Sequence, residues 1–535
     1  MFTVRRWLSA AATGGGGAAA RGGSAAARGG RVPRIGELRT AREVLQVHER
    51  HALQMRPVDV SSCWSTLGKL IRQHREECEW MKAELRRSKA LAPLLDSMLQ
   101  KLPLFEPRSV ATAVYGLASV VSATRFAPDK RVWKALEARS ADVSTEFNPQ
   151  ELANTAYAFV KAKHPAPALL DAIAAEAAPR VRDFNAQDLA NTAWAYATAQ
   201  HAAPALLDAI AAEAAPRVRD FKPQELANTA WAYAAADHCS CEVLFGRPVF
   251  VAHCDATQAA FLPEDLCQLH QWQLWLEERG AAWPRLPLPL AERCHAAFVA
   301  VKGRPSRLQR QVVAALKALG HEPREEVRTP QGYSLDAVVR IASREVAIEV
   351  DGPSHFVGRT HAPTGATALK RRQLRAAGWS LVPVPYWQWG ALDATGQREL
   401  LLRELRNATE PKEPKAETDP RVTKKVRELL HKWGLDESSL ESCKPTAYNG
   451  AKFGLGDIAH LEPVKTKKTK AAPKAADVRD GARSAELLDS SSSSGSAEDG
   501  MDNDRMKKRL LPAPDGEDCE KQYASVESFR PCPRI

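Results

Sequence analysis

The chain has 535 residues and a formal net charge of +11, with a sequence pI near 9.1. This length leaves room for two or three folded units with tails, and the positive charge favours a polyanionic partner. No stretch approaches the roughly 20 apolar residues needed to span a bilayer, so we expect no membrane insertion.

The first 36 residues combine six arginines with many alanines and glycines, and they contain no acidic residue. This composition is typical of an organellar transit peptide. The start from Met1 to Leu8 favours a mitochondrial presequence, so we expect the protein in the mitochondrial matrix, with a plastid as the alternative. Residues 37–57 are expected to form a linker or an entry helix.

A repeat follows over residues 58–280. Phe147, Phe184 and Phe221 lie 37 residues apart, and residues 166–184 recur letter for letter as residues 203–221. Each copy opens with an aromatic residue, places apolar residues on one helical face, and ends its second helix at a proline. A fixed period of this length predicts an α-solenoid of helical hairpins, in which stacked neighbours supply the core. Residues 281–303 are expected to be a linker.

Two polar residues recur side by side in three copies of the repeat. Helical repeat proteins that read RNA place one or two polar side chains per unit against a base edge. An asparagine that is identical in every copy is equally suited to a structural role, bonding the next repeat's backbone. Both hypotheses stay open for these pairs, which are Asn154 and Thr155, Asn191 and Thr192, and Asn228 and Thr229.

Charged and aromatic residues also recur in the repeat. Arg180 and Arg217 lie between hairpins and are candidates for neutralising RNA phosphates. Tyr157, Trp194 and Trp231 either stack on bases or belong to the core.

Five potential zinc ligands gather near the end of the array. Their spacing is irregular, so reduced and mostly buried thiols are the alternative that we favour, and we expect no metal there. The residues are His238, Cys239, Cys241, His253 and Cys254.

A second fold begins after the array. Residues 306–319 form an amphipathic pattern, and residues 333–339 and 346–350 read as strands, the second of which ends at a turn. A basic helix over residues 369–377 and a strand over residues 379–386 complete a small α/β domain.

The strings from Glu349 to Phe356, from Thr367 to Arg372 and from Gly378 to Trp389 resemble the RAP domain, over residues 304–405. The repeats resemble octotricopeptide repeats, and the combination is similar to the FAST kinase domain-containing family. The resemblance implies a mainly α chain, an α-solenoid followed by a small α/β domain with a restriction-endonuclease-like fold. It further implies an organellar RNA-binding protein in RNA processing, stability, translation or ribosomal RNA maturation. The implied partners are single-stranded or structured organellar RNA and other RNA-processing proteins.

The acidic residues of this domain raise a nuclease alternative. Restriction-endonuclease-like sites hold Mg²⁺ between carboxylates, with a lysine that orients the attacking water. Asp336 and Glu349 fill the first two places, but Asp351 stands where the lysine belongs, so Lys370 would have to supply the positive charge. We expect no cofactor unless this alternative holds, in which case Mg²⁺ is required.

The competing hypothesis is a fold that binds RNA without cutting it. Asp336 and Glu349 then pair with Arg371 or Arg372, and the domain contacts RNA through His355, Lys370, Arg371 and Arg372. A catalytic role for His355 is the alternative to RNA contact. A third hypothesis makes the array a protein-binding scaffold with an inert final domain.

Residues 406–535 are rich in Lys, Glu, Pro and Ser. This composition predicts a mostly disordered charged tail, with one helix over residues 422–433. Both termini are therefore expected to be disordered.

Overall fold

The computed structural model describes residues 32–301, 303, 305–358 and 360–410. Almost all of the predicted transit peptide lies outside these residues, as does most of the predicted tail with its helix over residues 422–433. None of the helices in the described ranges combines the length and the apolar content that crossing a bilayer requires.

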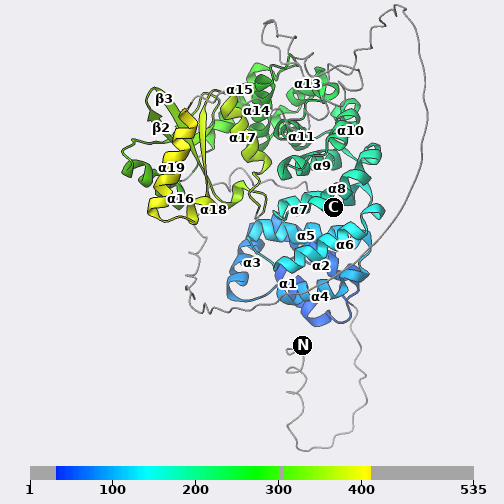
Figure 1. The fold of residues 1–535 in the computed structure, drawn as a ribbon. Helices are drawn as coiled ribbons and strands as arrows, with labels where there is room; N and C mark the ends of the chain where they lie inside the picture. Colours follow the sequence, from blue (N-terminus) through cyan, green and yellow to red (C-terminus); the bar gives the residue numbers. More distant parts are fainter. Residues whose placement is uncertain (1–31, 302, 304, 359, 411–535) are drawn as a thin grey trace, which may run out of the picture. The chain divides into compact units, whose positions relative to one another are not determined.

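Helical hairpins stack in chain order over the first part of the described chain (Figure 1). One helix of each unit packs against its counterparts in a row that we call the first-helix row, formed by α2, α5, α7, α9, α11 and α14. The partners α4, α6, α8, α10 and α12 contact one another in a second row. The bounds are α1 (Ala41–His51), α2 (Pro57–Gln73), α3 (Arg75–Arg87), α4 (Ala92–Lys101), α5 (Pro107–Thr124), α6 (Lys130–Asp142), α7 (Pro149–Lys161), α8 (Pro167–Ala177), α9 (Ala186–Ala199), α10 (Pro204–Ala214), α11 (Pro223–Ala236), α12 (Glu242–Phe245), α13 (Val249–Ala256) and α14 (Pro263–Glu278).

Local sequence signals explain where these helices begin. In α7 the Asn148 side chain accepts a hydrogen bond from the Glu151 backbone at 2.9 Å, and the Glu151 carboxylate accepts one from the Asn148 backbone at 3.0 Å. This reciprocal cap satisfies two amides that a helix start otherwise leaves unpaired. Just before it, Phe147 is fully buried, as are its counterparts Phe184 and Phe221 to within a few per cent. The predicted stack of helical hairpins is confirmed.

Short 3₁₀ segments close several of the hairpins. They shorten the connection between a second helix and the aromatic residue that opens the next copy. Their bounds are η1 (Ile35–Glu37), η2 (Leu102–Leu104), η3 (Ser144–Glu146), η4 (Ala178–Asp183), η5 (Ala215–Asp220), η6 (Gln258–Ala260) and, in the second fold, η7 (Pro353–His355).

The segment that was expected to be a linker over residues 281–303 contains a further helix, α15 (Leu288–Ala300). Leu290 and Cys294 are buried in the core of the array, and Phe298 packs against the sheet that follows. These three residues recur every fourth position and form one apolar stripe, which is why the segment is a packed helix.

A four-stranded sheet forms the centre of the second fold, in the order β1-β2-β3-β4. The first three strands are antiparallel, and β3 pairs in parallel with β4 because α17 connects them. The predicted small α/β domain is therefore confirmed. The bounds are α16 (Arg307–Ala318), β1 (Arg324–Arg328), β2 (Ser334–Ile341), β3 (Arg344–Asp351), α17 (Gly365–Ala376), β4 (Ser380–Pro385), α18 (Tyr386–Gly390) and α19 (Ala394–Thr409).

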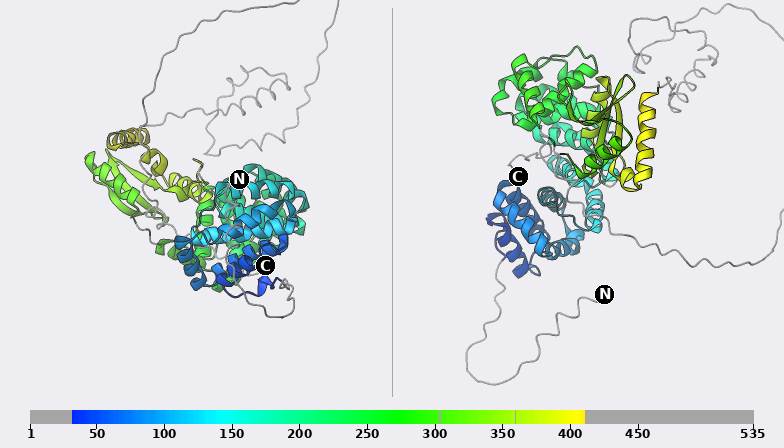
Figure 2. Two further views of the ribbon diagram at one scale, coloured as in Figure 1. Left: turned by 90° about the horizontal axis from the view of Figure 1, so that it is seen from below. Right: turned by 90° about the vertical axis from the view of Figure 1, so that its left-hand side faces the viewer.

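The two faces of the sheet have different partners. Val339, Val346 and Ile348 lie in one apolar cluster with α16 and α19. Val338 and Ala347 lie in another with Leu374 of α17, Leu274 of α14 and the side chain of Phe298. In Figures 1 and 2, α17 lies between the strands and the helices α11 and α14. The second face of the sheet is thus covered partly by the array itself.

Candidate nucleic-acid interface

Alternation along β2 and β3 brings the predicted acidic residues to the face of the sheet that carries α17. Ala347, Glu349 and Asp351 share this face because side chains two positions apart point the same way. Asp336 of β2 lies on the same side, since its carboxylate accepts a hydrogen bond from the Val350 amide at 2.6 Å. The structure therefore brings the three carboxylates together with α17.

Each of these carboxylates has a partner. Lys370 Nζ lies 2.5 Å from Glu349 Oε2, and His355 Nδ1 lies 2.9 Å from Asp351 Oδ1. Arg371 pairs with the other oxygen of Asp351. Arg371 thus pairs with Asp351 and not with Asp336 or Glu349, while Lys370 lies beside Glu349, where the nuclease hypothesis also places it.

The electrostatic consequences differ between the three acids. Burial raises the pKa of Glu349 to about 8, with the nearby charge of Asp336 adding to this effect against the opposing influence of Lys370. Burial also raises the pKa of Asp336. At Asp351 the penalty of burial is outweighed by the hydrogen bonds and charges of His355 and Arg371, so its pKa is lowered.

The carboxylates do not fit a divalent cation. In the described part of the chain, no group of three or more His, Cys, Asp or Glu side chains is placed to hold a metal ion. Glu349 and Asp351 already have cationic partners, and a hard cation needs carboxylate oxygens that are free to surround it. Mg²⁺ chemistry gains no support from this geometry.

A pocket of about 170 Å³ opens beside the acidic residues. Glu326, Asp336 and Glu349 contribute to its polar side, together with Lys370 and His355. Its apolar side includes Phe298, Val301, Cys267 and the ring of Tyr333. Sequence analysis could not assign Glu326 or Phe298 to this pocket, because they come from a strand and a helix whose place beside β3 is set only by the tertiary fold.

The recurrent polar pairs of the array lie mostly in its interior. Thr155, Thr192 and Thr229 are at most 1% exposed. Asn154 and Asn228 are buried, and Asn191 is half-buried. Asn228 Oδ1 accepts a hydrogen bond from Gln268 Nε2 of the next first helix at 3.2 Å. This contact between neighbouring repeats supports the structural-amide hypothesis at Asn228.

The recurrent arginines bind the backbone of the aromatic residue that opens their own copy. Arg180 donates to the carbonyl of Phe147 at 2.9 Å, and Arg217 donates to that of Phe184 at the same distance. The same contact joins Arg139 to the carbonyl of Phe105 at 2.8 Å, and His253 Nε2 to that of Phe221 at 2.9 Å. These contacts, which we call the closing ties, join the end of a hairpin to the aromatic residue that opens it, and they account for the periodic recurrence of a basic side chain at this place.

Aromatic residues of the first-helix row form a ladder. Tyr115, Tyr157, Trp194 and Trp231 follow one another with ring centroids 6.1, 5.1 and 6.4 Å apart. All four are buried, with 5–8% of their surface exposed. Trp231 Nε1 donates to Gln271 at 3.0 Å, and Gln271 Nε2 donates to the Tyr333 hydroxyl at 2.9 Å. The ladder therefore leads from the array to the rim of the pocket.

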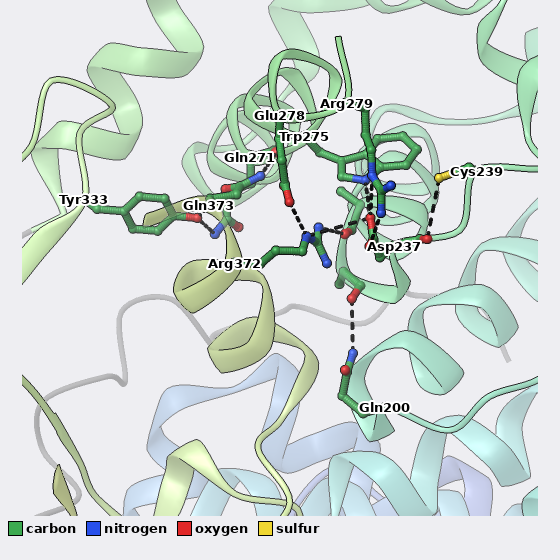
Figure 3. Close-up of polar contacts among 12 residues, drawn as sticks. Gln200, Asp237, Cys239, Gln271, Trp275, Glu278, Arg279, Tyr333, Arg372 and Gln373 are labelled. Atoms are coloured by element: carbon green, nitrogen blue, oxygen red, sulfur yellow. Dashed lines mark hydrogen bonds and ion pairs between the residues drawn. The ribbon is translucent and has the colours of Figure 1, made fainter. Parts of the chain in front are cut away.

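A polar junction fixes α17 to the array (Figure 3). Arg372 donates to the Glu278 carboxylate at 2.7 Å and to the backbone carbonyl of Ala234 at 2.5 Å. Gln373 Nε2 donates to the carbonyl of Gln271 at 2.8 Å. Arg372, a predicted RNA contact, is thus engaged with the array, whereas Lys370 and Arg371 face the acidic strand.

A glycine permits this approach. A Cβ atom on Gly365 would collide with the backbone carbonyl of Ala197 in α9. The first turn of α17 can therefore lie against α9 only because residue 365 has no side chain. The sequence offered no signal for this, since the contact joins segments far apart in the chain.

The potential zinc ligands have other partners. His238 Nε2 lies 2.7 Å from the Asp208 carboxylate, and Cys241 Sγ donates to the carbonyl of His238 at 3.1 Å. Cys254 is buried, and Cys239 is exposed. Burial raises the pKa of the Cys254 thiol, which favours its neutral form.

Comparisons with known proteins agree with this two-part organisation. Residues 348–405 match the RAP domain, and residues 111–260 match the RNA-editing substrate-binding complex 6 protein. A chloroplastic RAP domain-containing protein of Oryza sativa subsp. japonica is 39% identical over 100 residues, which cover 19% of this chain and 15% of that protein. The chain therefore contains a RAP domain, preceded by a helical repeat array similar to the RNA-editing substrate-binding complex 6 protein.

Proposed function

We propose that this protein binds single-stranded RNA in an organelle, with the array and the RAP domain acting as one binding unit. The observation that carries the proposal is the polar junction at Arg372, which joins an array similar to an RNA-editing complex protein to a RAP domain. The positive net charge of the chain agrees with a polyanionic partner.

The finer steps are part of the same proposal. Binding to organellar transcripts would serve their processing, stability or translation, or the maturation of ribosomal RNA. The arginine-rich and acid-free start of the chain supports import into mitochondria, while the name of the rice relative supports a plastid. Import of a fusion of residues 1–36 to a reporter, assayed with both isolated organelles, distinguishes the two locations.

The proposal excludes metal-dependent cleavage by the RAP domain. Lys370 and Arg371 are paired with Glu349 and Asp351, so a divalent cation that used these carboxylates would have to compete with two buried ion pairs. A protein-binding scaffold is the other competing function, and it predicts no affinity for RNA.

The test is binding of fluorescent single-stranded RNA to the protein at about 50 and about 200 mM salt, with and without Mg²⁺. We expect binding that weakens at the higher salt concentration, with intact RNA in every sample. Discrete products that require Mg²⁺ and disappear in Asp336→Ala would establish the nuclease instead. The absence of binding at both salt concentrations would overturn the proposal in favour of the scaffold.

A further inference from the structure

One carboxylate oxygen in the RAP-domain pocket has no hydrogen-bond partner among the described residues. Glu349 is 2% exposed, and its Oε2 pairs with Lys370, but its Oε1 has no hydrogen-bond partner among the described residues. Leaving a buried acceptor unpaired is unfavourable, so such an atom in a pocket wall requires an explanation. A ligand that donates a hydrogen bond at this point supplies one.

A strained backbone places a second carboxylate in the same wall. Glu326 lies in β1 with φ at 53°, a left-handed conformation that is rare for a residue other than glycine. Gln309 Nε2 donates a hydrogen bond to Glu326 Oε1 at 2.8 Å, and the Ser334 hydroxyl donates one to Glu326 Oε2 at 3.0 Å. Strain of this kind persists where the surrounding structure enforces it, and it is concentrated at functional sites.

The opposite side of the pocket is aromatic. Phe298, from α15 of the array, is half-buried, and its ring lies 4.9 Å from that of Tyr333 at an interplanar angle of 89°. Flat apolar walls of this kind bind the face of an unstacked base, and base–aromatic stacking contributes to binding by many single-strand readers. Together the two sides suit a ligand with a flat face and an edge that donates hydrogen bonds.

We propose that the pocket between α15, the sheet and α17 binds one unpaired guanine base of the RNA, which Glu349 recognises through the donors of its Watson–Crick edge. Guanine presents adjacent N1–H and N2–H donors, whereas uracil presents a single N–H between two carbonyl acceptors. The aromatic side would receive the face of the base. This inference rests on the proposed RNA binding.

The aromatic ladder of the first-helix row ends beside this pocket. Trp231 is joined through Gln271 to Tyr333, and both Gln271 and Tyr333 line the pocket. An RNA that follows the first-helix row would therefore reach the pocket at the carboxyl-terminal end of the array. The base recognised there would lie at one end of the bound segment.

The test compares otherwise identical uridine oligonucleotides that carry one guanosine, one inosine or no purine at a scanned position, using the full-length protein. We expect at least tenfold tighter binding of the guanosine oligonucleotide than of the all-uridine one, at one position only. Inosine lacks the N2 donor and should give an intermediate affinity. Equal affinities for all three oligonucleotides would overturn the pocket proposal while leaving RNA binding intact, and no binding at all would overturn both proposals.

A pair of variants assigns the effect to the pocket. Glu349→Gln has nearly the same size but loses the carboxylate, so the preference for guanosine should disappear. Glu345→Gln alters an exposed carboxylate of the same strand and should retain the preference. If Glu349→Gln does not fold, as judged by thermal unfolding, Phe298→Ala replaces it, because Phe298 is half-buried and supplies only the aromatic side. A guanosine preference that survives in folded Glu349→Gln, or an affinity for the guanosine oligonucleotide that is unchanged in folded Phe298→Ala, would contradict the proposal.

Discussion

The array and the RAP domain use their polar residues in different ways. In the array, recurrent polar groups serve the contacts of the repeats: Arg180 and Arg217 bind the carbonyl that opens their own copy, and Asn228 binds Gln268 of the next copy. In the RAP domain, Glu349 and Glu326 occur once, and they line a pocket in which one carboxylate oxygen is unpaired within the described residues.

Residues that recur with the repeat are therefore interpreted differently from residues that occur once. A residue that recurs in every copy is constrained by a contact within the repeat or between repeats, and that contact is the same in every copy. A surface that distinguishes one base from another must vary from copy to copy. The single, non-repeating residues of a repeat protein are therefore the better place to look for recognition.

The greatest loss in the free energy of unfolding is expected at the polar junction between the array and the RAP domain. Arg372→Met should lower the free energy of unfolding by about 3 kcal/mol, because it leaves the mostly buried Glu278 carboxylate without its ion pair. Chemical denaturation measures this loss, and limited proteolysis should release the RAP domain from the array. Arg375→Met, at an exposed position of the same helix, is the matched control and should have little effect.

The next largest change in the free energy of unfolding is expected at Asp188, a buried acid at the start of α9. Burial raises the pKa of Asp188 to about 6, so the folded state holds a proton at pH values where the unfolded chain has lost it. The contribution of Asp188 to stability is therefore full below about pH 4 and is lost as the pH rises through 6. Asp188→Asn should raise the free energy of unfolding at pH 7.5 by about 2 kcal/mol and change it little at pH 4.

Thermal unfolding at the two pH values measures this difference. Asp183→Asn, at an exposed position five residues before Asp188, serves as the control. An equal change at both pH values would show that the charge of Asp188 does not lower the stability of the array.

The smallest change in the free energy of unfolding is expected at the closing ties. Arg180→Ala should lower the free energy of unfolding by about 1.5 kcal/mol, because the carbonyl of Phe147 loses a charged donor. Arg182→Ala should cost less than about 0.5 kcal/mol, since the Arg182 side chain is 82% exposed. If Arg180→Ala leaves stability unchanged and weakens RNA binding, the arginine is a phosphate contact and not a tie.

Much of the fold could be predicted from the sequence. The 37-residue spacing of Phe147, Phe184 and Phe221 fixes the repeat, and proline or asparagine before each first helix marks its start. In the RAP domain, the apolar run at residues 346–350 and the basic pattern at residues 369–377 predicted a strand followed by a helix, and pairing of the acidic residues with that helix was one of the hypotheses. These features are local or periodic, so a single sequence contains them.

The candidate site could be predicted only in part. The sequence predicted that Asp336, Glu349, Asp351 and Lys370 lie together. It did not predict the aromatic side of the pocket, because that side comes from α15, in a segment that was expected to be a linker. It also assigned Arg372 to RNA, although the partner of this residue lies 94 positions away in the array. Contacts between distant segments depend on how the two folds dock, and no local pattern encodes that.

The most direct test of the central claim is photocrosslinking of a single-stranded RNA to the full-length protein, with the crosslinked peptides identified by mass spectrometry. If the array and the RAP domain bind RNA as one unit, crosslinks should appear both in the first-helix row and at Phe298 or Tyr333 of the pocket, on the same RNA molecule. Crosslinks confined to exposed arginines such as Arg182 and Arg219, with none at the pocket, would contradict the account.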